Sequence, residues 1–393
     1  MKILFVTQHM ELGGICKSLL NLLWILKDKD LSVDLLVLTG DENHIRKMTE
    51  NLNINNCFVC RNTHIFYRSY RQQNNIYDAL KKISWLFKIK VIGREAVVRQ
   101  IIACERNYES YDVAISYSNG IWTNDCREFM GGSEYLVLDR VQAKRKIAWI
   151  HSEPRKLGIT KDICLRLYSK FDKIVDVSKG CKKILDEISP EIKSKSVVFY
   201  NLCNAENIRK NANLGNPYSD NINKFKIVTV CRIENVSKRI DRAIECAIRL
   251  REQVGSNFIW TVVGDGPDRG NLQKLVDAND LKPVFKFVGR KENPYPYVKN
   301  ADLYVLTSDY EAFPLTVKEA LLLGVPAVIT PIPPSQELID NGRNGYIVDF
   351  DSKCISEKIT YIMGNSDELN RLRKNLENEQ ESESYESFIE LIS

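Results

Sequence analysis

The chain has 393 residues, 44% of them hydrophobic and 27% charged, and a formal net charge of +5. This composition excludes a collagen, a coiled coil and a disordered chain, and the length favours two domains. The charge is uneven: residues 1–200 hold 32 Lys and Arg against 23 Asp and Glu, and the rest hold 24 against 28. A basic half attracts phosphate, whether in nucleic acid, in lipid or in a phosphorylated ligand.

The N-terminus passes from Lys2 straight into a short strand-like run, without the apolar core of a signal peptide. No apolar run approaches the roughly 20 residues that a membrane helix needs. Eleven cysteines are scattered singly, and only Cys57 and Cys60 have a C-x-x-C spacing, with no second pair to complete a zinc site. We therefore expect a cytoplasmic protein with reduced thiols.

The first half alternates strand and helix patterns. A strand over residues 1–6, a loop with Gly13 and Gly14, a helix over 18–26 and a strand over 33–38 are typical of the start of a doubly wound α/β domain. Further short apolar runs of the kind that a parallel sheet buries on both faces lie at 113–117, 146–150, 173–177 and 196–200.

A stretch rich in Asn, Gly, Pro and Ser predicts a linker over 204–223. A second α/β series follows it, with strands expected at 226–230, 258–263, 284–288, 302–306, 325–330 and 345–348, and helices at 239–251, 271–278 and 316–323. The fold class is therefore α/β, with two Rossmann-like doubly wound domains facing each other across a cleft. We expect an N-terminal acceptor-side domain over 1–203, a C-terminal donor-binding domain over 224–375, and a final polar helix over 376–393. That helix could pack back on the N-terminal domain or remain solvated with a short apolar anchor. In such sheets ligands bind at the carboxyl ends of the strands.

One strand of the second series leads into a loop and helix with two glutamates. Pro314 suits the first turn of a helix, and the amides after it would form a phosphate site. Glu311 precedes this helix and Glu319 lies inside it, so that both can face one cavity and accept hydrogen bonds from sugar hydroxyls. Taken alone, two glutamates at this spacing also fit a solvated surface.

A second loop after a strand carries Arg232 and Lys238. Two fixed cations near a helix terminus can hold a diphosphate, with Arg forking onto two oxygens and Lys acting as a point charge. In isolation, a basic surface loop is the alternative.

In this order, the two segments resemble the retaining GT-B glycosyltransferases of the family-4 type, among them bacterial enzymes of capsule and surface-polysaccharide synthesis. The family's Glu-x7-Glu signature is matched by Glu311 and Glu319, and its Arg and Lys by Arg232 and Lys238. The turn at residues 264–267 and the Gly13-Gly14 loop are also typical. The resemblance covers nearly the whole chain, most strongly over 226–350 and weakly over 40–110.

The resemblance implies a role for each matched position. The residues with an implied catalytic role are Arg232, Lys238, Glu311 and His151. Those with an implied donor-binding role are Gly13, Gly14, Gly264, Phe313, Pro314, Leu315, Thr316 and Glu319. The two cations would bind the donor diphosphate and stabilise the charge of the leaving phosphate. Glu319 would hold the ribose and Glu311 the donor sugar. His151 matches a histidine near the sugar, although a structural histidine is the alternative.

The implied reaction transfers a sugar from a nucleotide-sugar donor, with a UDP-sugar expected on frequency alone, to a lipid-linked or oligosaccharide acceptor. It retains the anomeric configuration and needs no cofactor, no metal and no protein nucleophile. The sequence departs from the family pattern in three places. The spacing from Arg232 to Lys238 is one residue longer than usual, so Arg239 could substitute for Lys238. Ala312 replaces a glycine, and residues 330–335 replace a glycine-rich loop.

Two other functions stay open: a nucleotide-sugar epimerase of the same fold, and a non-catalytic partner subunit. A nicotinamide oxidoreductase is excluded because Arg269 stands where the third glycine of its G-x-G-x-x-G turn belongs.

The basic excess concentrates in a segment at about 61–106, where cations alternate with large apolar side chains. That composition suits an element lying in a bilayer interface. The candidate membrane or acceptor contacts are Lys81, Lys82, Trp85, Lys88 and Lys90. We expect a peripheral protein on the inner face of the cytoplasmic membrane. An ordinary core helix with a solvated basic face is the alternative. Nucleic acid is excluded because no known binding pattern accompanies the charge.

Overall fold

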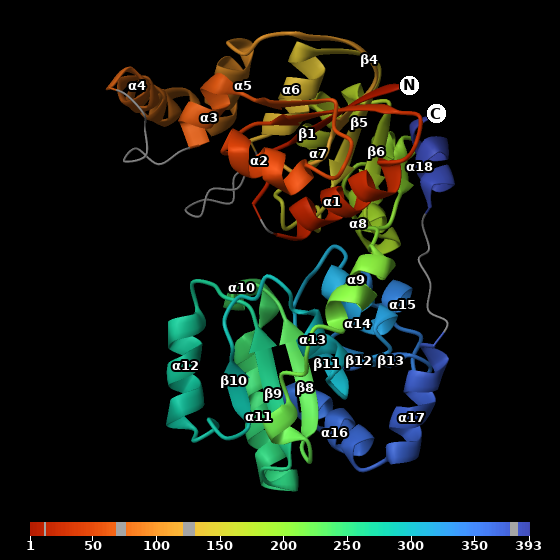
Figure 1. Cartoon of the computed structure of the whole chain (residues 1–393). Helices are drawn as coiled ribbons and strands as arrows, with labels where there is room; N and C mark the ends of the chain where they lie inside the picture. Colours follow the sequence, from red (N-terminus) through yellow and green to blue (C-terminus); the bar gives the residue numbers. More distant parts are fainter. Residues whose placement is uncertain (12, 68–75, 121–129, 378–383) are drawn as a thin grey trace. The chain divides into compact units, whose positions relative to one another are not determined.

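The structure, a computed structural model, describes the chain except for residues 12, 68–75, 121–129 and 378–383. The chain forms two compact units, which are described separately below (Figure 1). Unit 1 comprises Met1–Leu202 and Glu383–Ser393, and unit 2 comprises Cys203–Ser382.

Unit 1 is built on a seven-stranded parallel sheet with the order β3-β2-β1-β4-β5-β6-β7. Its strands are β1 (Lys2–Thr7), β2 (Ser32–Val37), β3 (Asn56–Val59), β4 (Tyr108–Ser116), β5 (Val141–Ile150), β6 (Lys173–Asp176) and β7 (Ser196–Val198). Its helices are α1 (Gly14–Leu26), α2 (Glu42–Thr49), α3 (Arg61–Tyr67), α4 (Ile76–Ile92), α5 (Arg94–Ala103), α6 (Gly132–Arg140), α7 (Lys161–Arg166), α8 (Lys179–Ile188) and α18 (Tyr385–Ile392), with single 3-10 turns at Tyr168–Lys170 and Pro190–Ile192.

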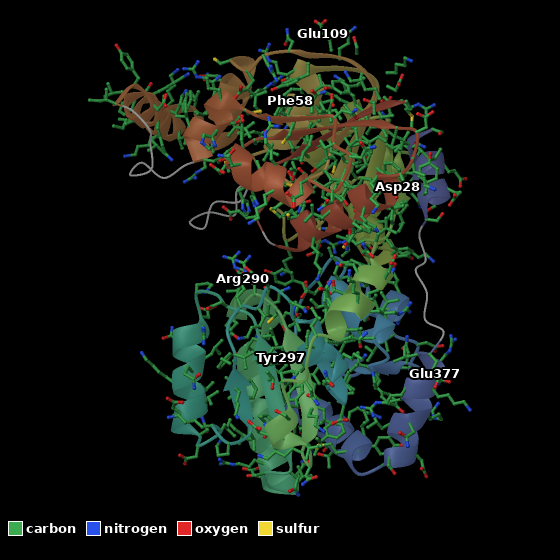
Figure 2. All side chains as sticks on the ribbon, viewed as in Figure 1. Asp28, Phe58, Glu109, Arg290, Tyr297 and Glu377 are labelled. Atoms are coloured by element: carbon green, nitrogen blue, oxygen red, sulfur yellow. The ribbon has the colours of Figure 1, made fainter. Side chains whose placement is uncertain are left out.

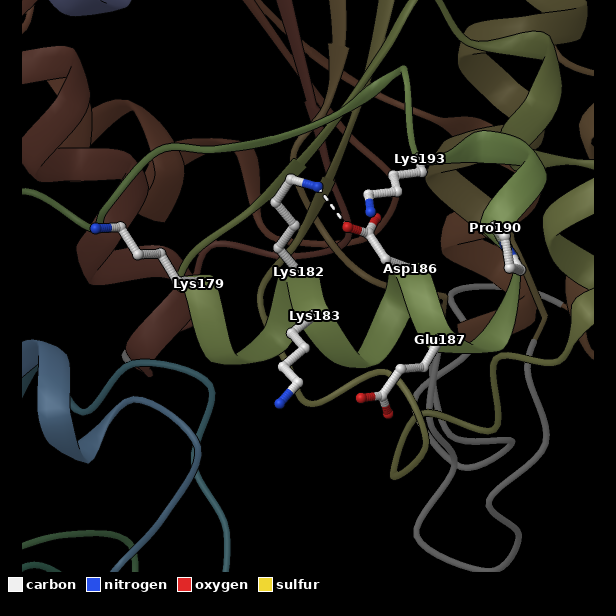
Figure 3. A pocket seen from close by; sticks show the side chains of 7 residues that line it. All are labelled: Lys179, Lys182, Lys183, Asp186, Glu187, Pro190 and Lys193. Carbon is white, nitrogen blue, oxygen red and sulfur yellow. Dashed lines mark hydrogen bonds and ion pairs between the residues drawn. The ribbon is translucent and has the colours of Figure 1, made fainter.

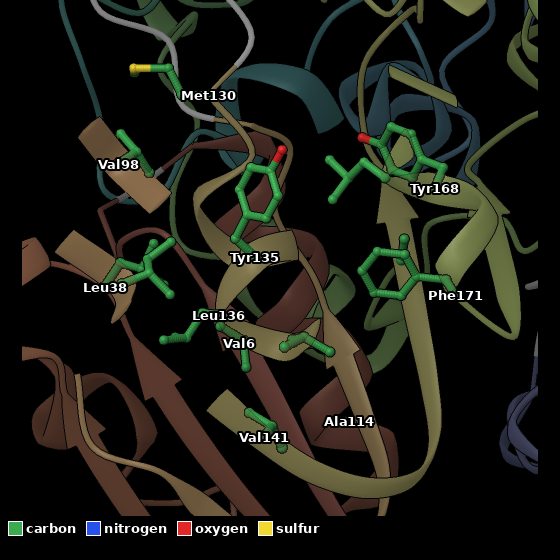
Figure 4. Close-up of a cluster of buried hydrophobic side chains, with 14 of the residues drawn as sticks. Val6, Leu38, Val98, Ala114, Met130, Tyr135, Leu136, Val141, Tyr168 and Phe171 are labelled. Atoms are coloured by element: carbon green, nitrogen blue, oxygen red, sulfur yellow. The ribbon is translucent and has the colours of Figure 1, made fainter. Parts of the chain in front are cut away.

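The sheet of unit 1 is buried on both faces, as a parallel sheet requires. On one face, Val6 and Ala114 pack under helices α5, α6 and α7, with Leu136 and Val98 among the contacts (Figure 4). On the other face, the ring of Phe5 meets Tyr117 edge-on, with ring centroids 5.8 Å apart. The periodic apolar runs of the sequence therefore fill two layers at once.

The segment at about 61–106 is not a surface addition to this core. Its described residues include helices α3, α4 and α5, and α5 contributes Val97, Val98, Ile101 and Ile102, each at most 1% exposed. The carboxylate of Glu105 accepts hydrogen bonds from the backbone N–H groups of Asn62 (2.7 Å) and Thr63 (2.8 Å) at the start of α3. Glu105 thereby satisfies helix donors that would otherwise lack an acceptor.

The C-terminal helix α18 belongs to unit 1, although it follows unit 2 in the chain. Phe388 is fully buried, with its ring 6.3 Å from Phe5 and 6.1 Å from Phe199. Arg145 donates to the carbonyl oxygen of Ile392 at 3.2 Å. The short apolar run near the C-terminus thus completes one face of the first sheet.

Unit 2 contains a six-stranded parallel sheet with the order β10-β9-β8-β11-β12-β13. Its strands are β8 (Phe225–Val230), β9 (Phe258–Val263), β10 (Phe285–Phe287), β11 (Leu303–Leu306), β12 (Ala327–Ile329) and β13 (Gly345–Ile347). Its helices are α9 (Ala205–Ala212), α10 (Asn235–Lys238), α11 (Ile240–Val254), α12 (Arg269–Ala278), α13 (Tyr295–Lys299), α14 (Leu315–Leu322), α15 (Ser335–Leu338), α16 (Ser352–Met363) and α17 (Ser366–Asn375), with a 3-10 turn at Ser219–Asn221.

Side chains fill the space between sheet and helices in this unit (Figure 2). Helices α11, α12 and α16 cover one face, where the rings of Trp260 and Phe285 pack with centroids 5.8 Å apart and planes tilted by 40°. On the other side, α9, α13 and α14 share a smaller cluster that includes Ile208 and Leu315. Residues 204–223, expected to be a linker, therefore contain a helix that packs into unit 2. The polar composition conceals it because only one face of α9 is apolar.

Candidate functional site

The residues expected to bind substrate fall into two groups, one in each unit. Arg232, Lys238, Glu311 and Glu319 lie in unit 2, whereas the Gly13-Gly14 loop and His151 lie in unit 1. All of them follow the carboxyl ends of parallel strands or lie in the helices that begin there.

In unit 2, two loops are fastened together because β8 and β11 are neighbours in the sheet. The hydroxyl of Thr307 donates to the backbone oxygens of Lys238 and Arg239, both at 3.0 Å. The backbone N–H of Asp309 donates to the oxygen of Ser237 at 2.9 Å. The loop with the cations and the loop with Glu311 thus form one rigid edge.

The centre of this edge is an ion pair between Lys238 and Glu311. Ser308 donates to the same Glu311 oxygen at 3.0 Å. Burial acts to lower the pKa of Lys238, but the attraction and hydrogen bond of Glu311 outweigh it and raise this pKa above its usual value. Lys238 is therefore a fixed positive charge at neutral pH.

The side chain of Arg232 is exposed and makes no hydrogen bond or ion pair with the residues that the structure describes. It lies in the loop between β8 and α10, six positions before Lys238. Arg290, which follows β10 and is labelled in Figure 2, is a further exposed cation at this edge of the sheet. No motif of the sequence indicated Arg290, although its position just after a strand is the kind of place where a binding residue lies.

Arg239, the alternative to Lys238, has other partners. Its guanidinium pairs with Asp241 and with Asp309, both at 3.0 Å. Its backbone is left-handed (φ 49°) at the junction of α10 and α11. Of the two neighbours, Lys238 is the one whose side chain meets Glu311.

The glycines of the 264–267 turn have a steric role. A Cβ on Gly264 would lie 1.8 Å from the backbone oxygen of Cys231, and one on Gly266 would lie 2.2 Å from that of Ile233. No side chain fits at such distances, and Gly264 also has a positive φ of 148°. These glycines let the β9 loop support the loop that carries Arg232.

Helix α14 begins at Leu315, directly after Pro314. The hydroxyl of Tyr304 donates to Thr316 Oγ1 at 2.7 Å and fixes the first turn. As in any helix, the first N–H groups have no intrahelical acceptor and can receive an anion. Phe313 is buried before this turn, and Glu319 within the helix is only 1% exposed. Glu319 is thus a buried carboxylate, not a solvated surface residue.

In unit 1, His151 follows β5 and is 9% exposed. Its ring lies 4.5 Å from that of Tyr117 and is parallel to Trp149. Neither ring nitrogen has a hydrogen-bond partner among the described residues. Burial lowers the pKa of His151 to about 3, so the imidazole is neutral. A buried histidine without partners is unusual and fits a group that meets a ligand.

The loop of His151 is held by Asn119, which sequence analysis missed. Asn119 Oδ1 accepts from the backbone N–H of His151 at 2.6 Å, and its Nδ2 donates to Ser152 at 2.8 Å. The signal in the sequence is a Ser-Asn-Gly turn just after a buried strand.

The glycines at the start of α1 contrast with those of unit 2. A Cβ on Gly14 would meet nothing within 4 Å, and one on Gly13 would lie 3.9 Å from the Glu11 oxygen. The backbone does not need glycine here, because Gly13 has an extended φ of −167°. Because Gly13 and Gly14 have no side chains, a ligand could come close to the backbone at the N-terminus of α1.

Two of the candidate membrane contacts, Trp85 and Lys82, are not exposed side chains. Trp85 is 7% exposed and packs on Phe66 at 6.1 Å. Lys81 donates to Asn62 Oδ1 at 2.6 Å and Lys82 to the Phe66 oxygen at 2.9 Å. These contacts hold α4 to unit 1, although Lys81 remains exposed. Lys88 and Lys90 are exposed.

Two hollows in unit 1 lie apart from the expected substrate residues. One, of about 370 Å³, runs along α8 and carries Lys182 and Asp186 as an ion pair (Figure 3). The other, of about 860 Å³, lies beside β3 and includes Lys81, Phe58 and Arg106 in its lining. Side-chain chemistry and strand ends, not hollow size, therefore identify the candidate site.

Among the described residues, no group of three or more His, Cys, Asp or Glu side chains is placed to hold a metal ion. Cys57 and Cys60 form no disulfide. No described helix is both long and apolar enough to cross a membrane.

Comparison with known proteins supports the sequence resemblance. Residues 216–379 match the family described as "Glycosyl transferases group 1". An uncharacterized glycosyltransferase of Methanocaldococcus jannaschii, MJ1059, is 26% identical over 198 residues, 47% of each chain. The putative colanic acid biosynthesis glycosyltransferase WcaL of Escherichia coli is 29% identical over 157 residues, 37% of this chain and 38% of its own. The matches thus span about a third to a half of these relatives.

Solved structures are similar over nearly the whole chain. Anabaena Alr3699/HepE, in complex with UDP and glucose, has a TM-score of 0.67 at 16% identity, covering 96% of this chain and 93% of its own. S. aureus TarM, in a complex that contains UDP, has a TM-score of 0.70 at 14% identity and covers all of both chains. At these identities the likeness shows the fold. Residues 216–379 thus match the glycosyl transferases group 1 family, and the two α/β units of the chain have the GT-B fold.

Proposed function

We propose that the protein is a glycosyltransferase that moves a sugar from a nucleotide-sugar, a UDP-sugar, to an acceptor in surface-polysaccharide or glycolipid synthesis. The observation that carries this proposal is the Lys238–Glu311 pair beside the open Arg232. Arg232 and Lys238 could bind a diphosphate, and the carboxylate of Glu311 could bind sugar hydroxyls, all at one edge of the sheet of unit 2. UDP in the solved structures of Alr3699/HepE and TarM supports the choice of nucleotide.

The cations would act on the leaving group. Arg232 can fork onto two phosphate oxygens, and Lys238 supplies a fixed charge, so both would stabilise the negative charge that grows as the sugar–phosphate bond breaks. The N–H groups at the start of α14 add partial positive charge. With this neutralisation provided by the chain, we propose that transfer needs neither a divalent metal nor another cofactor.

The carboxylates and His151 would orient the donor. Glu311 is already oriented by Lys238 and Ser308, so it can accept hydrogen bonds from sugar hydroxyls. We assign the ribose hydroxyls to Glu319. Because His151 is neutral, we assign it a hydrogen bond to the sugar and not proton abstraction at neutral pH.

Retention of the anomeric configuration is part of the proposal. The acceptor hydroxyl would attack from the face of the departing phosphate, whose oxygen takes the proton. The new glycosidic bond forms as the sugar–phosphate bond breaks, and the nucleoside diphosphate leaves with the electron pair. The acceptor would be lipid-linked or an oligosaccharide, and it would reach the protein at the inner face of the cytoplasmic membrane.

A nucleotide panel tests the donor site. Thermal-shift measurements with UDP, GDP, ADP and CMP derivatives should show the largest stabilisation for a uridine nucleotide. Arg232→Ala and Glu319→Ala should each weaken binding by roughly tenfold or more, the loss of one charged hydrogen bond, with an unchanged circular dichroism spectrum. Lys274→Ala, an exposed lysine on α12, is the matched control and should bind normally.

Three results would reject parts of the proposal. Normal nucleotide binding and transfer by both Arg232→Ala and Glu319→Ala would overturn the site. Activity lost in EDTA and restored by magnesium would overturn the metal-free step. Turnover of a nucleotide-sugar with no acceptor present would identify an epimerase instead.

A further inference from the structure

Helix α4 has two faces of different character. Its inner face is anchored in unit 1 through Trp85, which packs on Phe66, and Ile89, which packs against the core. Lys81 and Lys82 are hydrogen-bonded on the same side. The helix is therefore a fixed part of unit 1, and these contacts hold its outer face in a defined position.

The outer face carries a row of large apolar side chains, here called the α4 outer row. Ile76 (73% exposed), Leu80 (58%), Ile83 (45%), Phe87 (70%) and Val91 (71%) form it. Their spacing of three and four residues places them within about 80° of one another around the helix axis, roughly opposite Trp85. This is the reverse of an ordinary surface helix, whose apolar face is turned to the core.

Two cations border the row. At about 100° per residue, Lys90 lies beside the row and Lys88 lies at its flank. Neither makes an ion pair with any described residue. The only acidic residue in α4 is Asp78, on the inner side, against four lysines. The outer face is thus apolar along its centre, and Lys88 and Lys90 lie at its edges together with the exposed Tyr77 and Leu86.

We propose that the α4 outer row binds an anionic lipid bilayer, with α4 lying parallel to the surface and the row buried among the acyl chains. A helix of 17 residues is about 25 Å long, which suits a position in the interface plane. Lys88 and Lys90 would pair with anionic headgroups. A second copy of this chain fits less well, because two such helices would bring two positive faces together.

Membrane binding would bring the protein to a lipid-linked acceptor, and this role rests on the proposed function. Binding of the α4 outer row to a bilayer does not itself depend on that function. The α4 outer row lies in unit 1, whereas the residues assigned to the donor diphosphate and ribose, Arg232, Lys238 and Glu319, lie in unit 2. Vesicle binding and nucleotide binding can therefore be measured independently.

Co-sedimentation of the full chain with vesicles is the test. Binding should be strong with phosphatidylglycerol and phosphatidylcholine mixtures, and at least roughly tenfold weaker with phosphatidylcholine alone. Leu80→Ser with Phe87→Ser should abolish binding to both. Lys88→Gln with Lys90→Gln should remove the preference for anionic vesicles. Ile222→Ser, an equally exposed apolar residue in unit 2 (74%), is the matched control and should bind like the unmodified chain.

Each outcome decides the inference. Binding that survives the Leu80 and Phe87 changes would overturn it, and so would equal binding to neutral and anionic vesicles. Sedimentation velocity without lipid tests whether a second copy of the chain binds the row instead. A dimer that dissociates when Leu80 and Phe87 are changed to serine would assign the row to a second copy. Uridine-nucleotide binding should be the same in all of these variants as in the unmodified chain. If the unmodified chain binds vesicles but no uridine nucleotide, the proposed donor site is wrong and the membrane surface stands.

Discussion

The ammonium of Lys238 is paired with Oε1 of Glu311, across 73 positions of the sequence. Each residue follows a different strand, and the pairing of β8 with β11 brings the two loops together. The pair gives Glu311 one defined orientation and keeps Lys238 charged. It also makes the two neighbouring cations, Lys238 and Arg239, separable by experiment.

Lys238→Ala should weaken binding of the nucleotide-sugar by roughly 10- to 100-fold, the effect of one charged hydrogen bond. Arg239→Ala should act mainly on stability, because Arg239 is paired with Asp241 and Asp309 at partly exposed positions worth about 1 kcal/mol. Titration calorimetry and urea unfolding of both variants separate the two effects. Stronger loss of binding in Arg239→Ala than in Lys238→Ala would reverse the assignment.

Two glycine-to-alanine changes should behave in opposite ways. Gly264→Ala places a methyl group 1.8 Å from the Cys231 oxygen and should cost on the order of 2 kcal/mol or more while displacing the Arg232 loop. Gly14→Ala meets no atom within 4 Å and should leave the melting temperature unchanged or slightly raised.

Transfer assays complete this pair. If substrate approaches the start of α1, Gly14→Ala should reduce transfer although the protein folds normally. Full activity of Gly14→Ala would show that the Gly13-Gly14 loop is not a contact surface. Normal stability of Gly264→Ala would show that the β8 and β9 loops can separate.

His151 should make unit 1 sensitive to acid. Its pKa is about 3 in the folded protein and 6.5 as an ordinary value, so below pH 6.5 the unfolded chain binds a proton that the folded chain excludes. Stability should therefore fall as pH drops from about 6.5 towards 3. His151→Gln should flatten this part of the stability curve, measured by urea unfolding between pH 4 and 7.

Because His151 stays neutral, the rate of transfer plotted against pH should show no step near pH 6.5 that is due to this residue. NMR of the imidazole should show a neutral ring down to about pH 4. A His151 signal that titrates near 6.5 would contradict the buried, neutral ring.

Phe388→Ala should destabilise unit 1 although the residue lies near the C-terminus. The fully buried ring touches Phe5 and Phe199, and its loss should cost about 3 kcal/mol. Tyr361→Ala, in α16 and 48% exposed, should cost little. Equal stability of the two variants in thermal unfolding would show that α18 does not complete the core of unit 1.

Much of the fold could be predicted because parallel strands need short apolar runs. The run at Phe258–Val263 becomes β9 with every residue buried. Strand β3 could not be predicted in this way, because Asn56–Val59 lies at the sheet edge and has no fully buried residue. Helix α9 was hidden in a polar stretch since only one of its sides packs.

The local sequence by itself determined which residue types follow each strand: the Arg232 and Lys238 loop, the Pro314 helix start, the glutamates at 311 and 319, and the resemblance to a glycosyltransferase family. Such features can be identified from the sequence because each depends on only a few neighbouring residues. Only the tertiary structure decided the partners. It paired Lys238 and not Arg239 with Glu311, and it buried Trp85. It also hydrogen-bonded Lys81 and Lys82 to α3 and left the α4 outer row exposed. Those outcomes depend on contacts between distant segments, and composition alone cannot show which face of a helix the core will cover.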